Sequence, residues 1–220
     1  MLVGAPGGAN QAASTESVVR CRPLRNSTFW KQSVARDSHR VTVGDWKGLY
    51  LSSLASARMR SGSRAWEVDR LYLRDQEPER ALDLLEQVAQ GARSRGAERV
   101  FLRVSSDSPI VDVARKVGFY ASYEELHLTG QDWQADSSDE PISRYSVESP
   151  TQADLHGLFQ LYCASTPQQV REGVGMTIDQ WSDSQEPAQT PRIETVLKLD
   201  GKIVGWRMFE PFGKTAAGGL

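Results

Sequence analysis

The stretch spanning residues 66–123 constrains the fold more than any other part of the chain. Its pattern predicts a strand over 66–73, a helix that begins at Pro78, a second strand over 100–104 and a short helix that ends at Gly118. Two strands joined by a crossover helix run parallel in one sheet. The sequence therefore predicts an α/β fold, in which helices flank a mixed sheet.

The helix between these two strands has the clearest periodicity in the chain. Its apolar residues recur at spacings of three and four and share one face: they are Ala81, Leu82, Leu85, Val88, Ala89 and Ala92. Pro78 suits the first turn, where its missing N–H has no helical partner. Gly96 suits the residue after the last turn. These signals predict one long amphipathic helix that covers a sheet.

The segments before this unit are harder to type. Residues 18–24 have the pattern of an edge strand, and residues 41–43 that of a short strand. Residues 46–57 fit a helix of one or two turns or a buried strand, because periodicity over so short a run does not separate the two.

Composition then changes along the chain and suggests a domain division. A polar, acidic and serine-rich stretch after a predicted strand over 119–128 has the character of a linker. We expect a disordered leader over 1–17, a first domain over 18–129, a linker over 130–141 and a second domain over 142–220.

The second domain contains familiar local signals. A strand over 142–148 is followed by Thr151 and Asp154, which are spaced as a helix opening. A β-hairpin turns at Asp200-Gly201, and the small residues at 213–220 predict a loose tail.

Charge and cysteine content exclude several classes of function. The net charge of −2 gives no general attraction for nucleic acid. The one basic cluster, Arg58, Arg60, Arg64 and Arg70, is expected on a solvated surface. Cys21 and Cys163 fit no metal or redox spacing, so two reduced thiols are expected and no metal. No apolar run reaches the roughly 18 residues of a membrane span, and the first residues lack the features of a signal peptide. The expected location is the cytoplasm.

Two short motifs carry a resemblance to a known family. Lys116-Val117-Gly118-Phe119, at the end of the short helix, resembles the ending of the acyl-CoA helix in the GNAT N-acetyltransferase superfamily. The later hairpin sequence LDGKIVG, which begins at Leu199, resembles the N-terminal half of the same family. The chain thus looks like a tandem GNAT-like protein, with a first copy and a partial second GNAT-like unit. The resemblance implies the GNAT-like acyl-CoA N-acyltransferase fold.

The resemblance also implies an activity and a set of cofactor contacts. A GNAT-type enzyme transfers an acetyl group from acetyl-CoA to an amine, here of a small molecule or a peptide, and self-association into a homo-oligomer stays open. The positions that match the cofactor-binding strand, loop and helix are Leu71, Tyr72, Leu73, Arg74, Arg80, Ala81, Leu82 and Asp107. The family's glycine-rich loop is replaced here by an acidic one, in which Asp75, Glu77 and Glu79 would repel a pyrophosphate. The alternative is therefore a catalytically inactive GNAT-like structural or ligand-sensing module.

Candidate catalytic residues follow from the same match. Glu67 and Asp69 lie two apart and share one face of their strand, which Leu71 and Leu73 would continue. Carboxylates that lead into an apolar stripe favour a raised pKa, which suits a general base. The alternative is that they pair with Arg64 or Arg70. The family's usual general-acid tyrosine is replaced by Ala114, and the nearby substitutes are Tyr120 or Tyr123 on the following predicted strand.

Overall fold

The computed structural model describes residues 10–13, 38–48, 50–74, 78–126, 144–188, 191–212 and 215–219. The predicted edge strand over 18–24 and the predicted linker over 130–141 lie outside these residues. The chain divides into two compact units. Unit 1 combines Met1–Tyr120 with Asp179–Pro187, and unit 2 combines Ala121–Ile178 with Ala188–Leu220. A stretch from late in the sequence therefore belongs to the first unit, which a division into consecutive domains does not anticipate.

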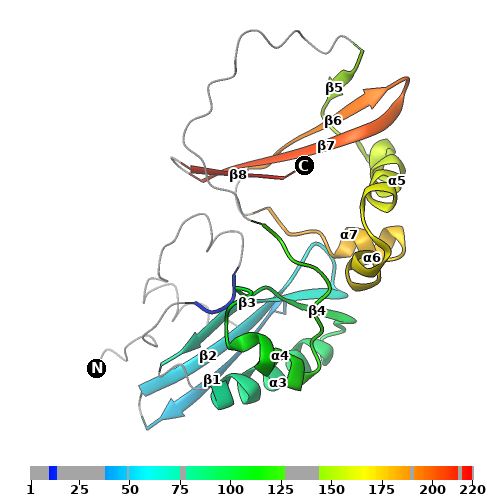
Figure 1. Cartoon of the computed structure of the whole chain (residues 1–220). Coiled ribbons are helices and arrows are strands. Elements are labelled where there is room, and N and C mark those ends of the chain that lie inside the picture. The colour runs from blue at the N-terminus through cyan, green and yellow to red at the C-terminus, as the bar shows by residue number, and fades with distance from the viewer. Residues whose placement is uncertain are drawn as a thin grey trace. The chain divides into compact units, whose positions relative to one another are not determined.

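Unit 1 is built on a four-stranded sheet in the order β1-β2-β3-β4 (Figure 1). Its strands are β1 (Arg40–Lys47), β2 (Tyr50–Met59), β3 (Ala65–Leu73) and β4 (Arg99–Leu102). β2 pairs antiparallel with both β1 and β3, whereas β3 and β4 pair parallel. The predicted parallel pair and the mixed sheet are thus confirmed.

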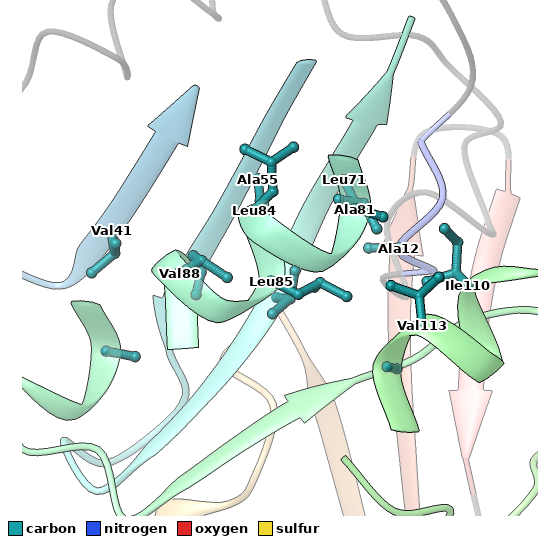
Figure 2. Packing of buried hydrophobic residues seen from close by; sticks show 14 of the residues in the cluster. Ala12, Val41, Ala55, Leu71, Ala81, Leu84, Leu85, Val88, Ile110 and Val113 are labelled. Carbon is teal, nitrogen blue, oxygen red and sulfur yellow. The ribbon is translucent and has the colours of Figure 1, made fainter. Parts of the chain in front are cut away.

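Two helices cover one face of this sheet. α3 (Pro78–Arg93) and α4 (Ile110–Val117) enclose, together with the sheet, a core whose largest fully buried members include Trp66, Leu71 and Leu85. Figure 2 shows Leu84, Leu85 and Val88 of α3 among the side chains of this core. The apolar face that the periodicity predicts is the face that α3 buries, because burial of apolar surface is the main force that holds an amphipathic helix against a sheet.

The end of α4 also follows its predicted signal. Gly118 has a φ of 100°, and its N–H bonds the carbonyl of Arg115, as in a left-handed helix cap. Glycine adopts this conformation without steric cost, since it lacks a Cβ.

Two predictions about neighbouring segments are resolved differently. The ambiguous stretch over 46–57 is strand, since most of it lies in β2 between β1 and β3. The predicted strand over 119–128 is wrong for its described part, because residues 119–126 have no regular secondary structure. Tyr120 and Leu126 are 69% and 85% exposed there. An alternating pattern forms a strand only where a neighbouring strand accepts its backbone hydrogen bonds.

A β-bulge changes the faces of β3. Ser56 of β2 pairs with Arg70 and the next residue, Ala57, pairs with Val68, so Asp69 has no partner in the register. The extra residue reverses the alternation of side chains beyond it. Leu71 and Leu73 therefore join the helix-covered core and do not continue the face of Glu67, which corrects the prediction.

Unit 2 contains a second four-stranded sheet, in the order β5-β6-β7-β8. Its strands are β5 (Ser146–Glu148), β6 (Ile193–Leu199), β7 (Lys202–Phe212) and β8 (Thr215–Gly219). Between β5 and β6 the chain forms η1 (Gln152–Asp154), α5 (Leu155–Ser165), α6 (Gln168–Val174) and α7 (Ile178–Asp183), whose residues from Asp179 onward belong to unit 1. The predicted hairpin is confirmed: Asp200 and Gly201 have φ values of 50° and 77°.

The other local predictions in unit 2 have mixed outcomes. Asp154 accepts hydrogen bonds from the Thr151 backbone and hydroxyl, both 2.8 Å long, so the helix opening is confirmed. The predicted loose tail is wrong for residues 215–219, which form β8 and pair antiparallel with β7. Among the described residues, no helix combines the length and the apolar character needed to cross a membrane.

Candidate functional site

The parallel strands β3 and β4 pair over only part of β3. The register runs from Ala65 opposite Arg99 to Val68 opposite Leu102, where β4 ends, whereas β3 continues for five residues to Leu73. We call residues 69–73 of β3, together with Arg103, the fork. Beyond Val68, the edge of β3 that faces β4 has no β4 residue opposite it in the register. Its backbone groups can therefore bond another extended segment.

Residues 10–13 of the same chain occupy the fork. The Gln11 N–H donates to the carbonyl of Leu71 on β3, and the Ala13 N–H donates to the carbonyl of Arg103 just beyond β4, each at 2.8 Å. Asn10 forms an isolated antiparallel bridge with Tyr72. Segment 10–13 thus bonds to both strands at the place where they part. The predicted disorder of the leader is wrong for these four residues.

The Asn10 side chain bonds both β3 and the backbone of its own segment. Its Nδ2 donates to the Asp69 carbonyl at 3.0 Å, and its Oδ1 accepts from the N–H groups of Leu71 at 2.8 Å and of Ala12 at 3.2 Å. The carboxamide therefore copies the donor and acceptor of a peptide unit beside the bulged part of β3. A single asparagine in a glycine- and alanine-rich leader has no periodicity, so the sequence offered no signal for this role.

Ala12 anchors the same segment in the core. Its side chain is only 1% exposed and belongs to the cluster that contains Leu71 of β3 and Ile110 of α4 (Figure 2). Segment 10–13 thus presents polar backbone to the strands and one methyl group to the helical layer.

Glu67, a predicted catalytic residue, lies in a buried ion-pair network on the face of the sheet opposite the helices. Arg58 donates from Nε to its Oε1 at 2.6 Å, and Arg60 donates from Nε to its Oε2 at 3.1 Å. The side chains of Glu67 and Arg60 are each 8% exposed. Two guanidinium groups therefore occupy both oxygens of the Glu67 carboxylate, which gives Glu67 the place of a structural charge in a buried ion-pair network.

Asp69, the second predicted carboxylate, has its own arginines. Arg40 donates from Nη1 to both carboxylate oxygens at 2.9 Å, and Arg70 lies 3.7 Å from Oδ2. The prediction that Glu67 and Asp69 share a face agrees with their joint place among these arginines. Of the two partners expected in the alternative interpretation, Arg70 pairs with Asp69, whereas Arg64 bonds Asp183.

The basic cluster is consequently not a solvated surface, which corrects that prediction. The side chains of Arg58, Arg60 and Arg70 are 16%, 8% and 15% exposed, and only Arg64 reaches 40%. Burial lowers the pKa of Arg70. Burial acts in the same direction on Arg58, but the carboxylates of Glu67 and Asp69 raise its pKa above the ordinary value. The arginines are tolerated inside because each neutralises a neighbouring carboxylate.

Segment 179–187 closes the network at the turn between β2 and β3. The N–H groups of Ser61 and Gly62 donate to the carbonyls of Gln185 and Asp183, each at 3.1 Å. Arg60 donates to the Ser184 carbonyl at 2.7 Å, and its guanidinium stands 4.3 Å from the centre of the Phe101 ring. Glu186 pairs with both Arg60 and Arg103. These contacts explain why a stretch so late in the sequence belongs to unit 1.

The predicted cofactor-binding residues fall into two groups. The side chains of Leu71, Leu73 and Ala81 lie in the core, and Leu82 packs against it, so only their backbone can reach a ligand in the fork. Tyr72 is 7% exposed and lies with Leu51 and Leu54 in a separate cluster. Burial raises the pKa of its hydroxyl.

The charged members of that set lie elsewhere. Arg74 is exposed after β3. Arg80, in the first turns of α3, donates to the Asp45 carboxylate at 2.5 Å and to the Ser52 hydroxyl at 3.0 Å. Asp107 is exposed in the turn before α4 and accepts a hydrogen bond from the Ser105 hydroxyl. Of the loop predicted to meet the pyrophosphate, residues 75–77 lie outside the described part of the chain.

The candidate general acid lies largely in solvent. Tyr120 follows α4 and is 69% exposed, whereas Ala114, at the family's tyrosine position, is 6% exposed within the core. The described ranges also contain no group of three or more His, Cys, Asp or Glu residues placed to hold a metal ion.

Comparison with known proteins identifies no family for this chain. No protein-family model matches the chain, and no curated protein matches it.

Proposed function

We propose that unit 1 binds acetyl-CoA as a GNAT-type N-acetyltransferase does, with an amine as the acetyl acceptor. The observation that carries this proposal is the fork. There β3 extends beyond the end of its parallel partner β4, and the backbone groups of Asp69 and Leu71 bond segment 10–13. The thioester arm of coenzyme A is extended and carries two amides, so its donors and acceptors fit this edge.

The fit can be tested against the contacts already present. The Leu71 N–H and the carbonyls of Leu71 and Asp69 are the groups that segment 10–13 uses. These groups would hold the amide arm, and the place of the Ala12 methyl would take one of its methylene groups. Acetyl-CoA supplies the activated acetyl group. The chain's own contribution is to align the arm along β3 and to exclude water with the core residues behind it.

The transfer itself needs little acid–base chemistry from the chain. The amine nitrogen forms a bond to the acetyl carbon, the bond from that carbon to sulfur breaks, and the thiolate leaves. Preorganised backbone N–H groups stabilise negative charge on the carbonyl oxygen during this step. Since Glu67 and Asp69 are held by arginines, the amine's proton passes to water and the two carboxylates act as structural charges.

A second candidate function is a non-catalytic module that binds acetyl-CoA or a related thioester. The specific observation in its favour is the ion pairing of both predicted base residues, Glu67 with Arg58 and Arg60, and Asp69 with Arg40. The two functions share the fork and differ in whether an amine is acetylated.

Thermal unfolding of the full chain with increasing acetyl-CoA tests the shared part. A ligand at about 100 times its dissociation constant adds ~2.7 kcal/mol of stability, which shifts the melting temperature by several degrees. No shift at millimolar acetyl-CoA would overturn the proposed function. Where a shift is found, release of free thiol in the presence of spermidine or a lysine-containing peptide supports the enzyme. Binding without thiol release supports the non-catalytic module.

A further inference from the structure

Segment 10–13 uses the same backbone groups that the proposed ligand needs. The Leu71 N–H and C=O and the Asp69 C=O are each bonded by Asn10 or Gln11. A hydrogen-bond donor on β3 cannot serve both an internal strand and the amide of an incoming arm at full strength. Occupation of the fork by the chain itself and by acetyl-CoA is therefore mutually exclusive.

Segment 10–13 is held in the fork by local contacts. Among the described residues, they include two bonds between the Asn10 side chain and β3, the bonds that the Gln11 and Ala13 N–H groups donate, and one buried methyl group, while the third Asn10 bond lies within the segment. By comparison, β2 contacts β3 along a register of seven residue pairs. An isolated bridge, in place of a register of paired residues, is typical of a segment at the low end of local stability.

We propose that segment 10–13 is an internal occupant of the fork that acetyl-CoA must displace, so that the chain inhibits its own site. The inference rests on the proposed function. The apparent dissociation constant then equals the intrinsic one divided by the fraction of molecules whose fork is open. Loosening the segment raises that fraction and tightens binding without changing any group that touches the ligand.

Two substitutions in the full chain separate this competition from simple damage. Asn10→Ala removes the three side-chain bonds, and Ala12→Glu places a charge where a 1% exposed methyl lies. Gln87→Ala removes the same carboxamide from an exposed position on α3 and is the matched control. Calorimetric titration with acetyl-CoA measures affinity. Hydrogen exchange at the Leu71 amide reports whether the segment has left the fork.

The expected result is about tenfold tighter binding of acetyl-CoA by Asn10→Ala, which corresponds to about 1.4 kcal/mol, with faster exchange at the Leu71 amide in the absence of ligand. Ala12→Glu should tighten binding at least as much, and Gln87→Ala should match the wild type. Equal affinity in all four chains, or weaker binding by both segment variants, would overturn the competition and leave the proposed function standing. Absence of binding in every chain would overturn the proposed function and, with it, this inference.

Discussion

Arg58 donates to Glu67 at 2.6 Å across the β2–β3 pair, and both side chains are largely withdrawn from water. Removing one charge from a buried ion pair costs about 3–5 kcal/mol, because the other charge stays buried and unpaired. We therefore expect Glu67→Gln to lower the free energy of unfolding by about 3 kcal/mol, the low end of that range, since glutamine keeps one acceptor oxygen. Urea unfolding measures the loss. Glu86→Gln on the exposed side of α3 should change little. Equal midpoints for Glu67→Gln and the wild type would refute a structural role for the pair.

Close packing of α3 on β1 gives a second prediction. A Cβ at Gly91 would lie 2.7 Å from Cγ1 of Val41. Alanine gains ~1 kcal/mol of helix propensity over glycine, but overpacking a core costs ~1–3 kcal/mol. Gly91→Ala should therefore destabilise the chain by about 1 kcal/mol despite the better helix former. Val41→Ala makes room, so the two substitutions together should cost less than the sum of each alone in urea unfolding. Strict additivity would contradict the contact.

The attachment of segment 179–187 predicts the effect of a small change at Gly62. A Cβ there would lie 2.7 Å from the Cβ of Asp183, which is too close for two carbon atoms. Gly62→Ala should weaken the bonds that Ser61 and Gly62 donate to this segment. Hydrogen exchange at these two amides should become about tenfold faster. Adding Asp183→Gly removes the clash and should restore protection, although it also removes the ion pair with Arg64. Protection that survives Gly62→Ala unchanged would rule out this contact.

Unit 2 carries an acid-sensitive contact. Hydrogen bonds from Lys198 and then from Thr151 lower the pKa of Asp154 from 3.8 to about 2. A carboxyl whose pKa is depressed on folding stabilises the native state at pH values above the unfolded pKa, and that stabilisation is lost as the pH falls through the folded one. The melting temperature should therefore drop between pH 4 and pH 2 in the wild type.

Asp154→Asn should flatten this part of the profile, because asparagine does not titrate. Glu172→Gln, on the exposed side of α6, should keep the wild-type slope. Identical slopes for Asp154→Asn and the wild type, measured by circular dichroism, would show that another group controls the acid transition.

The sequence predicts those parts of the fold that depend on neighbours along the chain. The periodicity of α3, the glycine cap after Val117 and the Asp-Gly turn of the second unit are all set within a few residues. The parallel pairing of β3 and β4 follows from the crossover helix between them. These features could be expected because local propensity and the handedness of the connection decide them.

The parts that escaped prediction depend on contacts between distant residues. The bulge at Asp69 is a one-residue shift in the register between β2 and β3. The sequence of β3 alone does not determine this register. The partners of Glu67 come from β2 and the following turn. Since the sequence does not show that these arginines face Glu67, it predicts a solvated surface for them. Asn10 bonds Leu71 across 61 positions. The sequence therefore predicts that Glu67 and Asp69 share one face of their strand, but it predicts neither that Leu71 and Leu73 leave that face nor which arginines lie on it.

The composition of unit 1 has a consequence for its synthesis. Its sheet, α3, α4 and the segment 10–13 are all translated by Tyr120, but the residues that bond the turn at Gly62 follow only at Asp179–Pro187. A nascent chain released after the first 129 residues would leave Arg60 without its bonds to Ser184 and Glu186. Unit 1 can therefore complete its contacts only after Pro187 has been translated. A recombinant piece that ends earlier would leave the β2–β3 turn without these partners.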